Sequence, residues 1–373
     1  MSEQIPGRME RIVSVDALRG LAMFMILSTQ IGGAPIFKTF VNLFGQPFVD
    51  ATASQLTWAN QAVTVLNIPQ SIFIFVVGLV IPFSLRGRLS RTNKMSVHIH
   101  VIVRAVVLFV LGMIAGGHLL SLQWDKFYFF NNVLEYIAIG YLCCALLVLN
   151  TGPKAHYAVT GGLLLLVWAI YLFIPAPGWQ GDRYSQEMNI GIYLDRVLLG
   201  PHGHPFKGYW TAVLNTIGQT SNMLLGVLVG QIVFGDRPKL QKARLLFISG
   251  AALLLGGMAW GLFFPSLRSN MTSSYVLQAC GISTLLLALF YLLIDFKGWS
   301  RWAFFFVVFG ANSIAIYMMA HLFKFNLIGD IFVGGLCRFF RPNVGNFIQA
   351  VAAMAVMWSI MYYMYRKRTF IKI

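Results

Sequence analysis

The stretch Arg11-Ile-Val-Ser-Val-Asp-Ala-Leu-Arg-Gly20 leads directly into an apolar run at residues 21–27, which with its flank is long enough to enter a bilayer. Asp16 and Arg19 stand at the start of this run. Because they are three residues apart, their side chains share one face of a helix. A single charge near a membrane is costly, so we expect the two to pair or to face a polar cavity. An ion pair that only fixes the first span is the alternative.

The composition is typical of an integral membrane protein. Of the 373 residues, 58% are hydrophobic and only 11% are charged, whereas soluble domains carry about 25% charged residues. No segment alternates in the way that a membrane β-strand does. We therefore predict an all-α integral membrane protein, with residues 1–373 forming one transmembrane domain. The polar first 12 residues lead into a span without a small-residue cleavage site, so we expect no cleaved signal peptide.

Apolar runs of roughly 20 residues, the length that a ~30 Å hydrocarbon core requires, recur along the chain. We predict a bundle of about 10 transmembrane helices (10–11) around a polar cavity. The predicted spans are residues 13–31, 63–85, 99–120, 133–149, 157–174, 211–234, 245–264, 275–294, 302–323 and 344–364. A further apolar run at residues 327–336 is too brief to cross, and it predicts a re-entrant or interfacial segment.

The net charge of +16 comes from basic residues that flank these spans. In a soluble protein such a charge would suggest nucleic acid, but beside membrane spans it sets orientation, so we expect no nucleic-acid partner. The N-terminus, every second loop and the C-terminus are basic, which predicts that both termini are cytoplasmic. We expect a multi-pass protein of the bacterial inner membrane. The four cysteines show no metal-ligand spacing, so no metal is expected.

Polar residues inside the predicted spans are a functional signal, because lipid cannot satisfy them. The set includes Asn67, Glu135, Asn312, Ser313 and His321. As a set, they favour a cavity between helices. For any one of them, an interhelical hydrogen bond, worth around 0.6 kcal/mol on average, is the alternative. His321 is equally compatible with an ordinary core histidine.

The longest predicted outer loop covers residues 175–210 and carries Asp195, Arg196 and His204. Long loops in compact proteins are often functional. A surface loop that only solvates the outer face is the alternative.

Several motifs occur in order along nearly the whole chain. They are Ser-Val-Asp-Ala-Leu-Arg-Gly (14–20), residues 67–78, Leu-Glu-Tyr-Ile-Ala-Ile-Gly-Tyr (134–141), Tyr-Leu-Asp-Arg-Val-Leu-Leu-Gly (193–200), Pro265 with Arg268, Gly-Ala-Asn-Ser-Ile-Ala-Ile-Tyr (310–317) and residues 365–373. Together they resemble the motifs of the transmembrane acyltransferases related to heparan-α-glucosaminide N-acetyltransferase, in the bacterial form without a luminal domain.

The resemblance implies a reaction in which an acyl group, typically acetyl from acetyl-CoA, is taken from the cytoplasmic side. It is passed to a sugar amine or hydroxyl on the other side. Such chemistry needs a base for the acceptor and donors for the developing oxyanion. We expect the matched charged residues to contact substrate or to line the cavity: Asp16, Arg19, Asp195, Arg196 and Arg268.

The chain departs from the family at the catalytic positions. Gln30 stands where the family has an Asn, and Asn67 replaces an Asp. The family's base is a His in the first outer loop, but no His occurs between Gln30 and Asn67. His204 is our first candidate for a substitute base, because it follows the Asp-Arg motif on the acceptor side. His118, at the outer end of the third span, is the second.

Two functions therefore remain open. The first is an acyltransferase that uses acyl-CoA and a sugar or glycan acceptor. The second is a catalytically inactive relative that transports or binds a glycan or a lipid-linked precursor in the same cavity. Membrane lipid surrounds the protein in both cases, and the oligomeric state stays open, a homodimer included.

Overall fold

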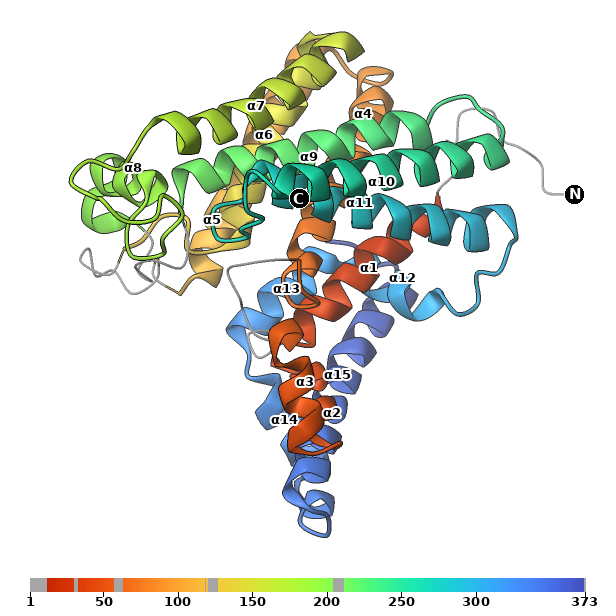
Figure 1. Cartoon of the computed structure of the whole chain (residues 1–373). Helices are drawn as coiled ribbons and strands as arrows, with labels where there is room; N and C mark the ends of the chain where they lie inside the picture. Colours follow the sequence, from red (N-terminus) through yellow and green to blue (C-terminus); the bar gives the residue numbers. More distant parts are fainter. Residues whose placement is uncertain are drawn as a thin grey trace, which may run out of the picture.

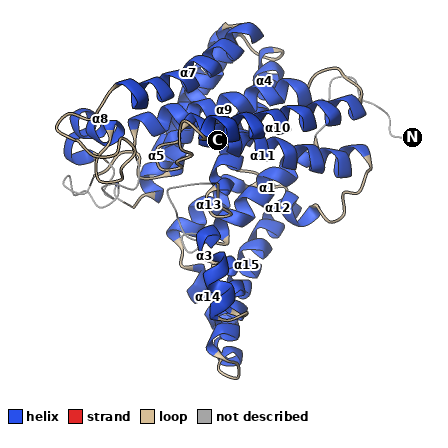
Figure 2. Cartoon of the chain, viewed as in Figure 1, coloured by secondary structure: helices blue, strands red, loops and turns tan. Residues whose placement is uncertain are grey.

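The computed structural model describes residues 12–29, 33–56, 63–117, 119, 127–203 and 211–371. Within these ranges the chain is helical and contains no strand (Figure 2). The helices are α1 (Val13–Leu27), α2 (Ile36–Asn42), α3 (Gln46–Leu56), α4 (Ile68–Leu89), α5 (Lys94–Ala115), α6 (Val133–Asn150), α7 (Pro153–Phe173), α8 (Ile190–Leu199), η3 (Gly200–His202), α9 (Val213–Val233), α10 (Lys239–Gly261), α11 (Ser273–Phe290), η4 (Tyr291–Phe296), α12 (Phe304–Ala311), α13 (Ser313–Leu322), α14 (Phe325–Cys337) and α15 (Pro342–Arg366).

Within the described residues, fewer helices meet the length and apolarity of a membrane span than the ten that the sequence predicts. Among the described residues, seven helices are long and apolar enough, or eight if the bent pair α12–α13 is one span. Each of the ten predicted ranges coincides with a helix or with this pair. However, α1 has only 15 residues, and the buried length of α9 carries amides and hydroxyls. The structure therefore indicates a multi-pass helical membrane protein, while the count of about ten is not confirmed.

The centre of the bundle is the contact between α4 and α9. Both helices carry glycine where their backbones touch. A Cβ at Gly78 would collide with the carbonyl oxygen of Met223, and Cβ atoms at Gly226 and Gly230 would collide with carbonyl oxygens of α4. Such small-residue faces are how membrane helices approach closely. Helices α6, α10 and α11 complete this bundle (Figure 1).

Helix α1 crosses α12 in the same manner. The Cβ of a larger residue at Gly20 would strike the Phe306 carbonyl, and one at Gly310 would strike the Asp16 carbonyl. The missing side chains of Gly20 and Gly310 therefore allow the two backbones to approach closely. Immediately after this crossing the chain bends by 74° between α12 and α13.

A separate arm extends below the bundle in Figure 1. It consists of α14, the first half of α15, and α2 with α3. Helix α14 lies along α15, where Gly329 meets the backbone of Ala353. With 13 residues, α14 is the short apolar helix that the run at residues 327–336 predicts.

Candidate functional site

The bundle contains a cavity of about 810 Å³ at one end, a size typical of small-molecule sites. Its walls come from the end of α4, the α6–α7 connection, the end of α9, the start of α10, and η4. The α9–α10 connection lies at the right of Figure 1, opposite α8. We call this site the basic cavity, because its lining includes Arg86, Arg237, Lys239 and Lys242.

The charges that line the basic cavity are unbalanced. Against its four basic residues stand two acidic ones, Asp236 and Asp295. The Asp295 carboxylate already accepts the backbone N–H groups of Val13 and Ser14, at 3.2 Å each, which places it at the start of α1. The net charge of the lining therefore favours an anionic ligand.

Two helices begin at the cavity wall, and neither start has a side-chain cap. Helix α7 begins at Pro153 and α10 begins at Lys239, and both residues line the cavity. The N-terminus of a helix carries a partial positive charge and free N–H groups, which attract anions. Both helices exceed 20 residues. Because the N-termini of α7 and α10 lie at the cavity wall, they add to the attraction that the basic side chains exert on an anion.

The opposite end of the same bundle holds a second polar region, which we call the polar cluster. It consists of Gln70, Ser71, Asn215, Arg268 and Tyr275. Arg268 donates from Nη2 to Gln70 Oε1 at 2.6 Å. The Tyr275 hydroxyl lies 3.2 Å from Ser71 Oγ, and it donates to the Asn67 carbonyl oxygen at 3.2 Å.

Helix α9 joins this cluster through its amides. Asn215 donates to the carbonyl oxygen of Ser269, next to Arg268, at 2.9 Å. One turn later, Gln219 donates to Asn215 Oδ1 at 3.0 Å. Burial lowers the pKa of Arg268 to about 10, so the guanidinium remains charged at neutral pH. The cluster therefore holds a buried cation among amides and hydroxyls.

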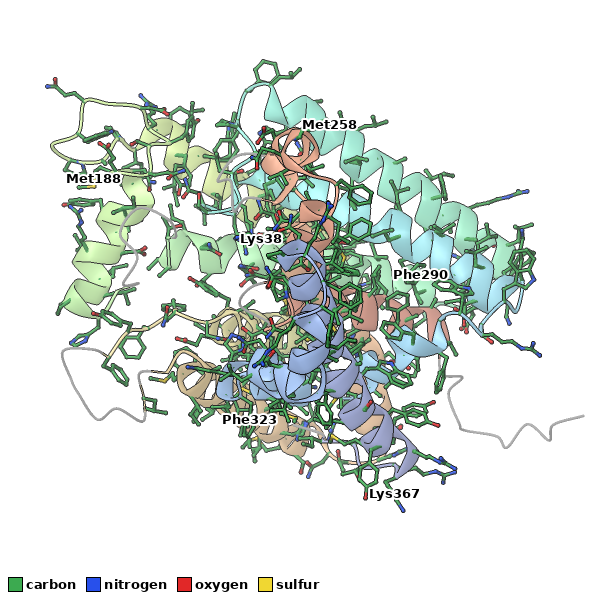
Figure 3. All side chains as sticks on the ribbon, turned by 90° about the horizontal axis from the view of Figure 1, so that it is seen from below. Lys38, Met188, Met258, Phe290, Phe323 and Lys367 are labelled. Atoms are coloured by element: carbon green, nitrogen blue, oxygen red, sulfur yellow. The ribbon has the colours of Figure 1, made fainter. Side chains whose placement is uncertain are left out.

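The two regions are connected by three helices. Gln70 and Arg86 on α4 are 16 residues apart, and so are Asn215 and Gln231 on α9. Tyr275 and Tyr291 on α11 and η4 show the same separation. At 1.5 Å per residue this corresponds to about 24 Å. Figure 3 labels Met188, before α8, and Phe290, beside η4, on opposite sides of the molecule.

Asp195 and Glu135 are buried and hold helix starts. Asp195 accepts the N–H groups of Ala212 at 2.6 Å and Val213 at 2.9 Å, at the start of α9. Glu135 accepts from Phe130 and Asn132 and completes a capping box on α6. Burial raises the pKa of Asp195 to about 6.

Arg196, next to Asp195 in the sequence, is exposed. Adjacent helical residues point in different directions. The side chains of Asp195 and Arg196 therefore lie in different surroundings, the first buried and the second exposed.

The other charged pair lies at the start of α1. Arg19 donates from Nη2 to Asp16 Oδ1 at 3.0 Å, with both side chains partly buried. The predicted pairing on one helix face is confirmed. The α1–α12 crossing lies beside it, because Gly310 meets the Asp16 carbonyl.

Asn312, Ser313 and His321 lie around the bent pair. Asn312 occupies the bend, where its amide donates to the Thr369 carbonyl at 3.0 Å and accepts from the Ile371 N–H at 3.1 Å. Ser313 is the buried first residue of α13. His321 contacts its own helix through Nδ1 and the Tyr317 carbonyl, at 2.9 Å. Of the three, Asn312 therefore fastens the C-terminal segment to the bend.

The three catalytic candidates, Gln30, His118 and His204, lie outside the described residues. Within the described ranges, no group of three or more His, Cys, Asp or Glu residues is placed to hold a metal ion. The catalytic assignment remains a prediction.

Sequence reasoning missed two residues that the structure brings to the basic cavity, His156 and Gln231. In the polar cluster, Gln70 accepts a hydrogen bond from Arg268. A polar residue at the end of an apolar span was the available signal for His156 and Gln231. Nothing in the linear sequence indicates that Gln70 and Arg268 meet, since they are 198 positions apart.

In comparisons with known proteins, no family model and no curated protein matches the chain.

Proposed function

We propose that this protein is a membrane-bound acyltransferase of the kind that its motifs resemble. It would pass an acyl group, typically acetyl, from cytoplasmic acyl-CoA to a sugar or glycan on the other side. The observation that carries the proposal is the basic cavity at the end of the bundle where the basic loops gather. The same helices carry the polar cluster at their other end.

The basic cavity suits the donor. Four basic side chains and two helix starts favour phosphate groups, which pair readily with arginine and lysine. The stacked rings of Phe83 and Phe234, with centroids 4.5 Å apart, provide an apolar wall. A ligand that combines phosphates with an apolar or aromatic part fits this lining.

The polar cluster supplies chemistry for acyl transfer. A guanidinium and a phenol, fixed by hydrogen bonds, are groups that stabilise a developing oxyanion when they are preorganised. Arg268 and Tyr275 are held in this way. In the proposal the base is His204, with His118 second, and the Gln30 amide assists the acceptor.

The first test is acyl transfer itself. Purified protein in proteoliposomes, loaded with radiolabelled acetyl-CoA on the side of the basic loops, is supplied with a panel of amino sugars on the other side. Labelled product is expected with wild type, and at least tenfold less is expected with His204→Ala. Transfer by wild type that neither His204→Ala nor His118→Ala slows would overturn the base assignment.

An inactive wild type gives a different answer. Thr57 or Trp58 occupies the approximate place of the family's His in this sequence. If Thr57→His or Trp58→His then restores transfer, the chain is a fold relative that has lost the family's base. Glycan binding or uptake without transfer would favour the transporter function. Orientation is checked separately: Gly181→Cys should react with an impermeant reagent from outside, and Arg237→Cys should not. The reverse labelling would invert the proposed sides.

A further inference from the structure

His156 is a buried histidine in the wall of the basic cavity. It lies in the first turn of α7 and is 4% exposed. Its Nδ1 is 3.0 Å from the side-chain nitrogen of Gln231 on α9, which also lines the cavity. Its Nε2 is buried and has no hydrogen-bond partner among the described residues. A buried polar atom without a partner is unusual and costs free energy.

The contact with Gln231 determines what Nε2 can do. An amide nitrogen only donates hydrogen bonds, so Nδ1 of His156 accepts. In a neutral imidazole the proton then lies on Nε2. A residue of the cavity wall therefore carries a buried N–H donor at Nε2, and Gln231 fixes the orientation of the ring.

The surroundings specify what this donor would meet. The cations of the cavity are Arg86, Arg237, Lys239 and Lys242, and the start of α7 is the turn that carries His156. Of the acids, Asp295 is occupied by the start of α1, and Asp236 is exposed. An anionic oxygen is the acceptor that this environment favours.

We infer that His156 is a ligand-binding residue of the basic cavity. It donates its Nε2–H to an oxygen of a phosphate or pyrophosphate group, with Gln231 as the positioning residue. The identification of that group with acyl-CoA rests on the proposed function, whereas the phosphate contact rests on the cavity alone.

The binding test uses CoA and inorganic pyrophosphate as probes, with the whole protein in neutral nanodiscs. His156→Leu should weaken both probes by about tenfold or more, since hydrogen bonds to charged groups are the stronger ones. His156→Gln should restore much of the binding, because its amide nitrogen reaches the position of Nε2. His156→Asn, which is too short, should not.

A matched control lies at the same end of the bundle. His98 on α5 is partnered at both ring nitrogens, by the Lys94 carbonyl and by Asn150. His98→Leu should leave both probe affinities unchanged. Equal losses in His98→Leu and His156→Leu, or equal binding by the Gln and Asn variants of His156, would overturn the inference. Melting temperatures exclude variants that fail to fold.

Gln231→Met tests the positioning role. The substitution keeps the length of the side chain and removes the donor to Nδ1. Pyrophosphate affinity should fall several-fold, while the melting temperature stays near that of wild type. In a ¹⁵N-histidine spectrum, the wild-type His156 should show the Nε2–H tautomer, and pyrophosphate should shift its Nε2 signal. An Nδ1–H tautomer in wild type would overturn the assignment.

The outcomes also separate this inference from the proposed function. Probe binding that depends on His156, in a protein without acyl transfer, would support the phosphate site and reject the acyltransferase.

Nanodiscs that contain phosphatidylglycerol identify the source of the phosphate. If this lipid displaces CoA and pyrophosphate through His156, the natural ligand is a lipid headgroup. If wild type binds no phosphate probe in any of these settings, the inference is wrong.

Discussion

The two polar regions of the bundle differ in how their side chains are satisfied. In the polar cluster, Arg268, Gln70 and Tyr275 bond to one another or to nearby backbone. In the basic cavity, cations line an open volume, and the buried Nε2 of the lining residue His156 has no hydrogen-bond partner among the described residues. Removing a partner from a satisfied network destabilises the fold, whereas removing a group from an open site changes binding. Stability and affinity are therefore the measurements that distinguish the two regions.

The largest effect is expected in the polar cluster. Gln70→Leu removes the oxygen that accepts from Arg268 at 2.6 Å, and it leaves a buried cation with fewer acceptors. We expect a loss of about 3 kcal/mol, seen as a lower folded yield and melting temperature. Gln70→Glu should recover stability, because a carboxylate also accepts. Arg86→Gln, at the other end of α4, is the control and should melt like wild type.

If Gln70→Leu and Arg86→Gln melted alike, the contrast between the two regions would be lost. The cluster would then be an open site as well. The hydrogen bond to Gln70 would then not be what holds Arg268 in place for the proposed oxyanion contact.

A smaller effect is expected at the start of α9. Asp195→Ala removes the carboxylate that accepts from Ala212 and Val213. Loss of such a cap costs about 2 kcal/mol at most. The neighbouring Arg196 is exposed, so Arg196→Ala should change stability by less than about 0.5 kcal/mol. Thermal melting of both variants in one detergent makes the comparison, and equal shifts would contradict the capping role.

The same carboxyl group predicts a pH dependence. Because burial raises the pKa of Asp195 to about 6, the folded state binds its proton more tightly than the unfolded state. The stability that this group contributes therefore falls as pH rises toward 6, by about 1 kcal/mol between pH 5 and pH 7. Asp195→Asn cannot titrate. The melting temperature of wild type, relative to this variant, should be higher at pH 5 than at pH 7; the opposite slope would show that the two N–H groups outweigh burial.

Local features of the fold can be predicted from the sequence, whereas contacts between distant segments cannot. The Asp16–Arg19 pair follows from helical spacing, and the Gly20 approach follows from the missing side chain, because both are local. The meeting of Gln70 with Arg268 depends on three helices packing together, which no local pattern encodes. Helices α1 and α9 show why the count of about ten spans is not confirmed: α1 is short, and α9 carries polar residues along its buried length.

The roles of the buried acidic residues Glu135 and Asp195 could not be predicted from the sequence either. A buried carboxylate near a span end indicates function or structure equally well from sequence alone. The structure places Glu135 and Asp195 on helix starts, where they satisfy backbone N–H groups. These contacts with backbone are invisible in the sequence, since the partners are atoms that every residue carries.

The smallest expected effects belong to the rim of the basic cavity, and they sharpen the role of His156. Arg237 and Lys239 are exposed, so each contributes to phosphate binding through screened charge. Arg237→Gln or Lys239→Gln should weaken pyrophosphate binding by less than about fivefold at low salt, and by less still at 0.5 M NaCl. The loss in His156→Leu should persist in salt, because a buried hydrogen bond is screened little. Binding isotherms at the two salt concentrations distinguish a hydrogen bond from His156 to the phosphate from a general electrostatic attraction by the basic residues. If the His156→Leu loss vanished in salt together with the rim effects, the cavity would attract anions without a specific contact.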